Sequence, residues 1–525
     1  MTALLLVTVA SCKEAPVQRG TGEIRLEAAE PGSLDPARAD DADEIMIVRN
    51  VFKGLVDYDP KTAAVRPASA TRWKVSADAR QFTFTLRHDN GFSNGEPVKA
   101  DNFVRAFNRA ASKAVASPLA SKLSNIVGYQ DYRDAKTDTL AGVKALDEYR
   151  LEITLVTSDA DFVAKLGQPV FSPLPSEAAI STQKPTYGER PIGNGPFMVD
   201  EWKHNEAVRL VPNPRWYGTK PALALVTFVL LSDLDLAYEQ WQAGNLDWTR
   251  VPPNSERQAE AQNQSRVIKK SPSTLLYLVA ITDLSPTRNL LLRQAISQSI
   301  DRRAISTRLS AGLDPPATGI FPPGMPGHRD GSGGTGPCFF CLYDPGKARD
   351  LLSAGRVPAN TLITLAYPAG LGMDEWVDEA AASIQRATRL PTRVVPKRPL
   401  SDYRAFLKGA KGGLFGAYSL TMSYPSPESF LQTMLAPGGD VNYSRWSNPA
   451  YDQYTADARV ARDDMDRLAL YRRAEDLVLN NLPIVPLWWR GELRLVNLNR
   501  FTGLDMDAFG YPTLENAAPK KATPA

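Results

Sequence analysis

The stretch that decides the fold class is Tyr343–Leu390, YDPGKARDLLSAGRVPANTLITLAYPAGLGMDEWVDEAAASIQRATRL. Asp344 is a helix N-cap and Gly355 is a helix stop, so the segment between them is predicted to be a helix. The apolar run Thr361–Ala366 predicts a strand, and a second helix is predicted over Asp374–Leu390. This order of helix, strand and helix favours an α/β protein over an all-helical or sandwich fold.

The same alternation of strands and helices extends over most of the chain. Apolar residues alternate with polar ones in Gln81–Leu86, which is typical of a half-buried strand. Lys99–Ala114 is predicted to be a helix with Asp101 as its N-cap, and Leu290–Leu309 is predicted to be one continuous helix. No fixed-period repeat is visible, which argues against a solenoid or a propeller.

The composition is that of an ordinary globular protein. The chain has 525 residues, of which 43% are apolar and 23% charged, and this length fits three or four domains or two large lobes. The 61 basic and 58 acidic side chains give a formal net charge of +3, which argues against a dedicated nucleic-acid binder. Three cysteines exclude a disulfide-rich scaffold, and three widely spaced histidines argue against a metal centre. We expect no metal and no cofactor.

The N-terminal segment indicates export. Ala3–Ala10 is an uncharged apolar run with the length of a signal-peptide core, and it is too short to span a bilayer. Val9–Cys12 resembles the lipobox of bacterial lipoproteins, in which the cysteine becomes the lipidated N-terminus. The basic residues expected before such a segment are missing, which a start codon assigned too late would explain; a short buried strand is the alternative. Cys12 is the expected lipidation site, followed by a polar tether.

Two short motifs carry weak signals for chemistry. Gly331–Gly336 has the G-x-G-x-x-G spacing but lacks the strand and helix that a dinucleotide site needs, so a flexible loop is the better interpretation. Cys338 and Cys341 form a C-x-x-C pair without a second pair or a nearby histidine, which in an exported protein favours a local disulfide over zinc. The sequence contains no G-x-S-x-G, H-E-x-x-H or Walker motif, and we expect no enzymatic activity.

Seven segments in order along the chain resemble family 5 solute-binding proteins of ABC importers, the oligopeptide- and dipeptide-binding lipoproteins. They are Pro67–Arg87, Gly91–Phe103, Gly193–Pro214 with Trp216 and Tyr217, Ala243–Asp247, Arg293–Arg302, Tyr343–Gly355 and Leu482–Trp489. Each string is weak alone, but seven in the same order are specific. The resemblance implies a periplasmic-binding-protein-like α/β fold of two lobes joined by a hinge, with an extra subdomain set into the first lobe.

The resemblance also implies how the chain divides. The expected parts are a signal peptide with lipobox (1–12), a tether (13–22), a first lobe (23–58, 184–278 and 490–512), an inserted subdomain (59–183), a second lobe (279–489) and a disordered tail (513–525).

Leu420–Leu431 corresponds to the family's ligand-binding loop. In the peptide binders an aspartate of this loop pairs with the α-ammonium group of the peptide, and Ser423 stands at that position here. A neutral hydroxyl does not replace a buried charge-assisted ion pair. The family's neighbouring arginine is absent near Ala417, and so is the cysteine pair that links the loop to the lobe. The candidate ligand contacts of the loop are Leu420, Met422, Ser423 and Tyr424.

Asp40–Glu44 aligns with the strand of the other lobe that contacts peptide in the family. It carries four carboxylates in five residues. Asp41 or Asp43 is the candidate for holding a cationic group of the ligand in place of the missing aspartate, and Ala42 between them is a candidate contact. The alternative is a solvated acidic loop at a helix N-terminus, where carboxylates are favourable in any case.

Aromatic residues are the remaining candidates. Tyr403, Tyr418, Tyr424, Trp488 and Trp489 fall in segments that line the cleft in the family, and such rings offer apolar area with a hydrogen-bonding edge. Core packing is the alternative for each of them.

One cation completes the candidate site. Arg490, directly after Trp489, is a candidate partner for a ligand carboxylate, with simple surface exposure as the alternative.

The resemblance implies an extracytoplasmic solute-binding protein that captures short peptides between its lobes and delivers them to an ABC permease and its ATPase subunits. The peptide would lie extended, held by backbone hydrogen bonds, with hydrated pockets for its side chains. We expect a monomer, tethered by lipid to a bacterial membrane in the periplasm or at the cell surface, with no nucleic-acid partner. Two alternatives stay open: a non-peptide solute such as nickel, a sugar derivative or an opine, and a sensor or chaperone module without import.

Overall fold

The computed structural model of the chain describes residue 20 and residues 22–180, 185–252, 255–310, 312–331, 336–437 and 441–520. Four sequence predictions fall wholly or partly outside these residues. They are the signal peptide with the lipidation site Cys12, the tether, the glycine-rich loop Gly331–Gly336, and the last five residues of the tail.

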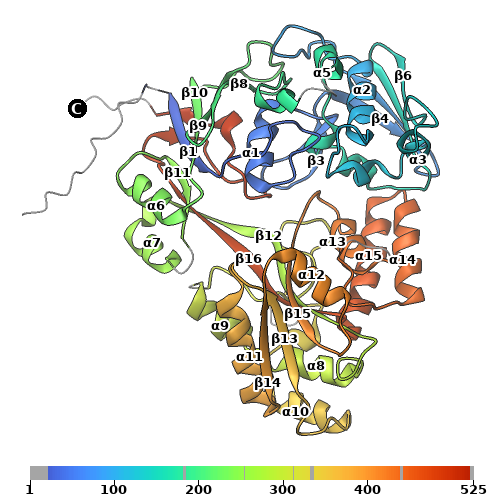
Figure 1. Ribbon diagram of the computed structural model, residues 1–525, viewed down its shortest axis with the longest axis vertical. Coiled ribbons are helices and arrows are strands. Elements are labelled where there is room, and N and C mark those ends of the chain that lie inside the picture. The colour runs from blue at the N-terminus through green and yellow to red at the C-terminus, as the bar shows by residue number, and fades with distance from the viewer. Residues whose placement is uncertain are drawn as a thin grey trace, which may run out of the picture.

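A mixed sheet of ten strands runs through both lobes (Figure 1). In spatial order its strands are β14 (Thr392–Lys397), β13 (Ile363–Pro368), β15 (Phe415–Thr421), β12 (Val267–Ala280), β16 (Ile484–Val496), β11 (Trp248–Arg250), β1 (Glu23–Ala28), β10 (Leu225–Leu230), β9 (Ala207–Pro212) and β8 (Phe197–Lys203). Helices lie between these strands along the chain, so the predicted α/β class is confirmed.

The two central strands, β12 and β16, are long enough to belong to both lobes. β12 has 14 residues and β16 has 13. Up to Lys270, β12 pairs with β16 in the first lobe; from Thr274 on, it pairs with β16 in the second lobe, and the register shifts between these halves. A Cβ atom on Gly491, beside this shift, would lie 2.0 Å from the carbonyl oxygen of Leu313. Only glycine therefore fits where β16 crosses between the lobes.

The first lobe and the inserted subdomain share one hydrophobic core, which contains Leu26 of β1 and Phe84 of the subdomain. The strands of this part, outside the large sheet, are β2 (Val56–Tyr58), β3 (Val65–Pro67), β4 (Ala70–Val75), β5 (Gln81–Leu86), β6 (Val143–Asp147), β7 (Arg150–Thr154), β17 (Phe501–Thr502) and β18 (Ala518–Pro519). Its helices are α1 (Ala42–Val51), α2 (Ala100–Ala111), α3 (Tyr129–Arg133), α4 (Phe162–Lys165), α5 (Ser176–Ile180), α6 (Leu234–Gln242) and α7 (Glu256–Gln262). The exact boundaries expected for the lobes and the subdomain stay predictions.

The second lobe buries both faces of its part of the sheet. Successive residues of a strand point to opposite faces, so β12 supplies Leu275 and Tyr277 to one core and Leu276 and Leu278 to the other. Its helices are α8 (Leu290–Gln298), α9 (Arg302–Leu309), α10 (Pro345–Ala354), α11 (Asp374–Thr388), α12 (Leu400–Lys408), α13 (Glu428–Leu435), α14 (Pro449–Val460) and α15 (Asp464–Asn481). Within the described part of the chain, no helix combines the length and the apolarity that crossing a membrane requires.

Two predicted helices differ in detail from the structure. The helix expected over Leu290–Leu309 is two helices, because the side chain of Asp301 accepts a hydrogen bond from the backbone of α9 and so starts a new helix. The N-cap of α2 is Lys99 and not Asp101, which lies inside the first turn.

The predicted disordered tail is wrong for residues 513–520. They form a 3-10 turn and the strand β18 (Ala518–Pro519), which pairs with β17 (Phe501–Thr502). The reason is apolar packing: Leu514 and Ala517 are each 1% exposed and belong to the core of the first lobe.

A buried ion pair connects the subdomain to the first lobe. Arg109 of α2 donates from its two terminal nitrogens to the two carboxylate oxygens of Asp35, at 2.9 and 2.6 Å. The two side chains are 5% and 3% exposed. Removing one partner of such a pair leaves an uncompensated buried charge, which is strongly destabilising.

We expect Asp35→Asn to lower the free energy of unfolding by about 3 kcal/mol, because Arg109 would stay buried without its counter-charge. Urea denaturation followed by tryptophan fluorescence measures this loss. Lys99 and Glu148 of the same subdomain pair at side-chain exposures of 35% and 65%, so Lys99→Met is the control and should leave the midpoint unchanged. An unchanged midpoint for Asp35→Asn would contradict the structural role of the pair.

Candidate functional site

A cleft of about 400 Å³ lies between the lobes beside the hinge. Residues of the first lobe, of both hinge strands and of the second lobe line it. Its described lining includes five carboxylates and three guanidinium groups: Glu27, Asp43, Glu256, Asp314, Glu492, Arg250, Arg490 and Arg494. The excess of acidic groups suits a ligand that carries a cationic group.

Glu27, Asp43 and Arg250 form a charge cluster in the wall of this cleft. The guanidinium of Arg250 donates to both carboxylates, at 2.9 Å to that of Asp43, and the Glu27 side chain is 1% exposed. Burial acts to lower the pKa of Arg250. The hydrogen bond and charge of Glu27, together with those of Asp43, outweigh burial and raise this pKa above its usual value. Asp43 also accepts the backbone N–H of Ala29 at 2.9 Å. Two carboxylates share one cation, so the cluster keeps a net negative charge.

The acidic segment 40–44 starts α1. Asp41 is the N-cap, and its side chain accepts the backbone N–H of Asp43 at 2.8 Å. Ala42 and Asp43 line the cleft. The carboxylate of Asp41 is thus engaged in the helix cap, and that of Asp43 in an ion pair. Their role in holding a ligand stays a prediction.

The predicted ligand loop is fastened to β12 at its start. The hydroxyl groups of Thr421 and Thr274 form a hydrogen bond of 2.8 Å. The backbone N–H of Met422 donates to the carbonyl oxygen of Ser273 at 2.8 Å. Two hydrogen bonds, one between side chains and one from the main chain, thus fasten the start of the loop to β12.

The four candidates of the loop lie in different surroundings. Leu420 is half-buried, Met422 is buried and Ser423 is exposed. Tyr424 is buried, and its hydroxyl donates to the carboxylate of Glu428 at 3.1 Å. The residues of this region that line the cleft are Ser419 and Thr421.

The predicted tyrosines of the second lobe pack inside it. The hydroxyl of Tyr403 donates to the carbonyl oxygen of Ala417 at 2.6 Å, and its side chain is fully buried. The hydroxyl of Tyr418 accepts from the guanidinium of Arg404 at 3.2 Å. These contacts are those of core residues, and their role as ligand contacts stays a prediction.

The predicted tryptophans are buried too. The ring N–H of Trp488 donates to the carbonyl oxygen of Arg302 at 2.8 Å. Trp489 meets the ring of His328 edge-on, with 5.2 Å between the ring centres. Arg490, the next residue, is exposed and lines the cleft.

Asp314 is a cleft residue that the sequence analysis missed. Asp314 and Arg490 line both the cleft and an adjoining hollow of about 200 Å³, whose wall includes Trp376 and Trp488. The carboxylate of Asp314 accepts the backbone N–H of Gly491 at 2.7 Å. Burial raises the pKa of Asp314, against the opposite effects of that N–H group and of Arg490. The only sequence signal is an acid before two prolines, which is typical of a turn.

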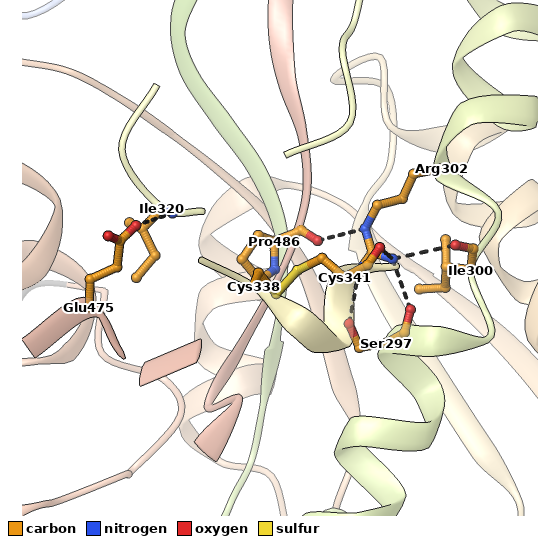
Figure 2. The surroundings of a disulfide bond; sticks show 8 residues. All are labelled: Ser297, Ile300, Arg302, Ile320, Cys338, Cys341, Glu475 and Pro486. Atoms are coloured by element: carbon orange, nitrogen blue, oxygen red, sulfur yellow. Dashed lines mark hydrogen bonds between the residues drawn. A yellow bond between two sulfur atoms is a disulfide. The ribbon is translucent and has the colours of Figure 1, made fainter. Parts of the chain in front are cut away.

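Cys338 and Cys341, the predicted local disulfide, are bonded to each other. Figure 2 shows that Arg302 connects them to the sheet: it donates to the carbonyl oxygen of Cys341 at 3.0 Å and to that of Pro486 in β16 at 2.9 Å. Burial lowers the pKa of Arg302 to about 9, which keeps its charge at neutral pH. The disulfide turn therefore belongs to the scaffold of the second lobe.

A larger hollow of about 660 Å³ lies between the subdomain and the second lobe. Small apolar residues make up most of its wall, including Ala63, Ala164 and Pro427. It offers few groups that would orient a ligand. We therefore take the smaller, charged cleft beside the hinge as the candidate ligand site.

We expect Arg250→Met to lower the free energy of unfolding by about 3 kcal/mol, because Glu27 would remain buried without a cation. Thermal and urea denaturation measure the effect. Arg209→Met is the matched control, since Arg209 pairs with Glu201 on the surface at 48% exposure and should not change the midpoint. Equal midpoints for the two variants would show that the cluster does not hold the cleft wall.

The chain is similar to known proteins over most of its length. Residues 64–442 match the family described as "Bacterial extracellular solute-binding proteins, family 5 Middle". The chain is 30% identical over 513 residues to the periplasmic murein peptide-binding protein MppA of Escherichia coli (strain K12), covering 94% of this chain and 93% of the relative. It is 27% identical over 508 residues to the dipeptide-binding protein DppE of Bacillus subtilis (strain 168), covering 93% and 90%.

Solved structures match over nearly the whole chain. The unliganded open form of MppA matches with a TM-score of 0.83 and 26% identity, covering 97% of this chain and 99% of that one. The E. coli murein tripeptide binding protein MppA matches with a TM-score of 0.74 and 27% identity, covering 95% and 98%. These matches confirm the expected two-lobed, periplasmic-binding-protein-like fold. The chain therefore belongs to family 5 of the bacterial extracellular solute-binding proteins.

Proposed function

We propose that this protein is the solute-binding component of an ABC importer and captures short peptides in the cleft beside its hinge. The family is one of extracellular solute-binding proteins. The two relatives described above are named as binders of murein peptide and of dipeptide. Family membership supports the import role, and the edge of β15 supports a peptide as the solute.

The free edge of β15 is the observation that carries the choice of a peptide. Tyr418–Thr421 pairs with β12 on one side, whereas β13 pairs with β15 only at Phe415 and Gly416. Among the described strands, this half of β15 thus has no partner on its second side, and Ser419 and Thr421 line the cleft. An extended peptide can add to such an edge as a further strand, so that its backbone supplies affinity for many sequences.

Capture by closure of the lobes follows from the hinge. A ligand that touches both walls of the cleft makes all its contacts only when the lobes close, so binding shifts an open-to-closed equilibrium.

Asp314 is our candidate partner for a ligand amino group, because Ser423 carries no charge. Asp41 and Asp43 are engaged with the α1 cap and with Arg250. The carboxylate of Asp314 accepts a backbone N–H, and burial raises its pKa. A cationic ligand group would relieve the cost of burying this carboxylate.

We further propose a monomer that acts by binding alone, is anchored by lipid at Cys12 and delivers its ligand to a permease with ATPase subunits. MppA of E. coli is named as periplasmic, which supports a place outside the cytoplasm. Peptide hydrolysis by the purified protein would contradict a role limited to binding. A non-peptide solute, or a sensor role without import, are the competing functions.

Native mass spectrometry of the purified protein tests the proposed ligand class. We expect masses of a mixture of short peptides bound one per chain, because backbone pairing accepts many side chains. One discrete non-peptide mass would overturn the proposal. The control uses the wild-type chain after its ligand has been removed and the chain refolded. This protein is titrated with a defined tripeptide in a calorimeter.

We expect Asp314→Asn to weaken binding of a tripeptide with a free N-terminus by about tenfold or more, the range of a hydrogen bond between charged groups. Since the pKa of Asp314 is raised, wild-type affinity should fall as the pH drops towards that of ordinary carboxyl groups, and the variant should lose this dependence. Calorimetry measures both, with exposed Asp402→Asn as the control. Equal loss for an N-acetylated tripeptide would exclude an ammonium partner.

A further inference from the structure

A buried charge cluster connects the subdomain to the second lobe, away from the hinge. Its six charged groups are Asp159, Asp161 and Lys165 of the subdomain and Glu428, Arg459 and Arg467 of α13, α14 and α15. The three carboxylates are 2%, 6% and 3% exposed in that order. Three negative and three positive charges balance, and the carboxylates of each side meet cations of the other side only while the two sides are in contact.

Lys165 lies at the centre of this cluster. Its Nζ is 2.5 Å from the carboxylate of Asp159 and 2.7 Å from that of Glu428, so it joins its own side to the second lobe. The three carboxylates lie close enough together to hold a metal ion, but the ammonium group of Lys165 already supplies the cation. Burial acts to lower the pKa of Lys165, but the charges of Glu428 and Asp159 outweigh burial and raise it.

Further contacts cross the same boundary. The hydroxyl of Tyr471 in α15 donates to Asp161 at 2.6 Å, and the guanidinium of Arg467 lies 3.3 Å from Asp161. The backbone N–H of Ala160 donates to the carbonyl oxygen of Arg459 at 2.9 Å. This last hydrogen bond joins the two lobes through their main chains and reports directly on whether they are in contact.

The cluster also holds the far end of the predicted ligand loop. Glu428 is the first residue of α13, and it accepts the hydroxyl of Tyr424 at 3.1 Å. The Nζ of Lys165 lies 5.4 Å from the centre of the Tyr424 ring, a distance typical of a cation–π contact. The near end of the loop is fixed by Thr421 and Thr274. The loop is therefore fixed at one end beside the hinge and at the other end by the charge cluster.

We propose that this charge cluster is a second joint between the lobes, which positions the ligand loop from the subdomain side and which mild acid tightens. The proposal rests on the fold and on these contacts, and it does not depend on what the cleft binds.

The direction of the acid effect follows from the carboxylates of the subdomain. Burial and the charge of Glu428 raise the pKa of Asp159 to about 6, and burial also raises the pKa of Asp161. Both pKa values return to the ordinary range when the lobes separate and water reaches the carboxylates. The joined state therefore binds protons more readily than the separated state, and it is favoured as the pH falls from 7 to 5.

The other groups that face Asp159 and Asp161 do not change this direction. Burial acts to raise the pKa of Glu428, but the charge and hydrogen bond of Lys165 outweigh burial and lower this pKa below its usual value. Glu428 is therefore ionised between pH 5 and pH 7. Arg459 and Arg467 keep their charge. The remaining titratable neighbours are Asp464, which pairs with Arg467 at 2.6 Å, and the hydroxyls of Tyr424 and Tyr471, whose pKa values are raised by burial.

Hydrogen-exchange mass spectrometry on the full chain, resolved to the Ala160 amide, tests the joint. We expect Lys165→Met to lower the protection of this amide at least tenfold at pH 7, because two buried carboxylates lose their shared cation. Strand β5 should keep its protection, which shows that the subdomain stays folded. Lys99→Met, which removes an exposed pair in the same subdomain, is the control and should change neither.

The pH dependence separates a charge-built joint from simple packing. After correction for intrinsic exchange, wild-type Ala160 should become about tenfold more protected between pH 7 and pH 5. Asp159→Asn mimics the protonated state, so it should be more protected than wild type at pH 7 and much less dependent on pH. Unchanged protection in Lys165→Met, or loss of protection in Asp159→Asn, would overturn the proposal. Loss of peptide binding with normal exchange would count only against the proposed function.

Discussion

Pairing between β12 and β16 is the constraint on which the two-lobed structure depends. The two strands form one ladder in each lobe, and the register shifts between them beside Gly491. Backbone hydrogen bonds hold each half, with a second register shift at Leu276 and Tyr277 in the second lobe. The pairing is interrupted between Lys270 and Thr274, so we expect bending to concentrate there. The candidate cleft lies at this crossing. Its walls come from the first lobe at Glu27, from the hinge at Thr274 and from the second lobe at Asp314. A small rotation at the hinge therefore changes the distances between all three walls.

Buried charge joins segments that are far apart in the sequence at three places in this molecule. Asp35 meets Arg109 between the first lobe and the subdomain, and Glu428 meets Lys165 between the second lobe and the subdomain. Glu27 meets Arg250 within the first lobe, in the wall of the cleft. Such pairs add little net stability compared with apolar packing, but they strongly disfavour arrangements that separate the partners. They therefore decide how the parts fit together more than how firmly each part folds. In a protein whose lobes move, this limits motion to arrangements that keep every buried charge paired.

Local signals predicted much of the fold, and almost none of the charge pairing. Asp344 and Gly355 act on their immediate neighbours, so α10 could be located from sequence, and the same reasoning applied to Asp301 would have divided α8 from α9. Asp43 and Arg250, in contrast, are 207 residues apart, and no local pattern tells which cation a carboxylate will meet. The aromatic candidates illustrate a second limit. A buried tyrosine such as Tyr403 and one that lines a cleft have the same sequence signature, because both need apolar surroundings and a partner for the hydroxyl.

The contacts at the two ends of the loop show that its course does not depend on the side chain at position 423. The loop is fixed at one end by the pair Thr421 and Thr274 and at the other by Glu428, and neither contact involves Ser423. The side chain at 423 can therefore vary while the backbone stays in place. The edge of β15 is independent of it as well, since backbone groups pair with an extended ligand whatever charge stands nearby. We infer that the residue at 423 bears on which end group of a ligand is recognised, and that the edge of β15, at which a peptide backbone would add, is built without it.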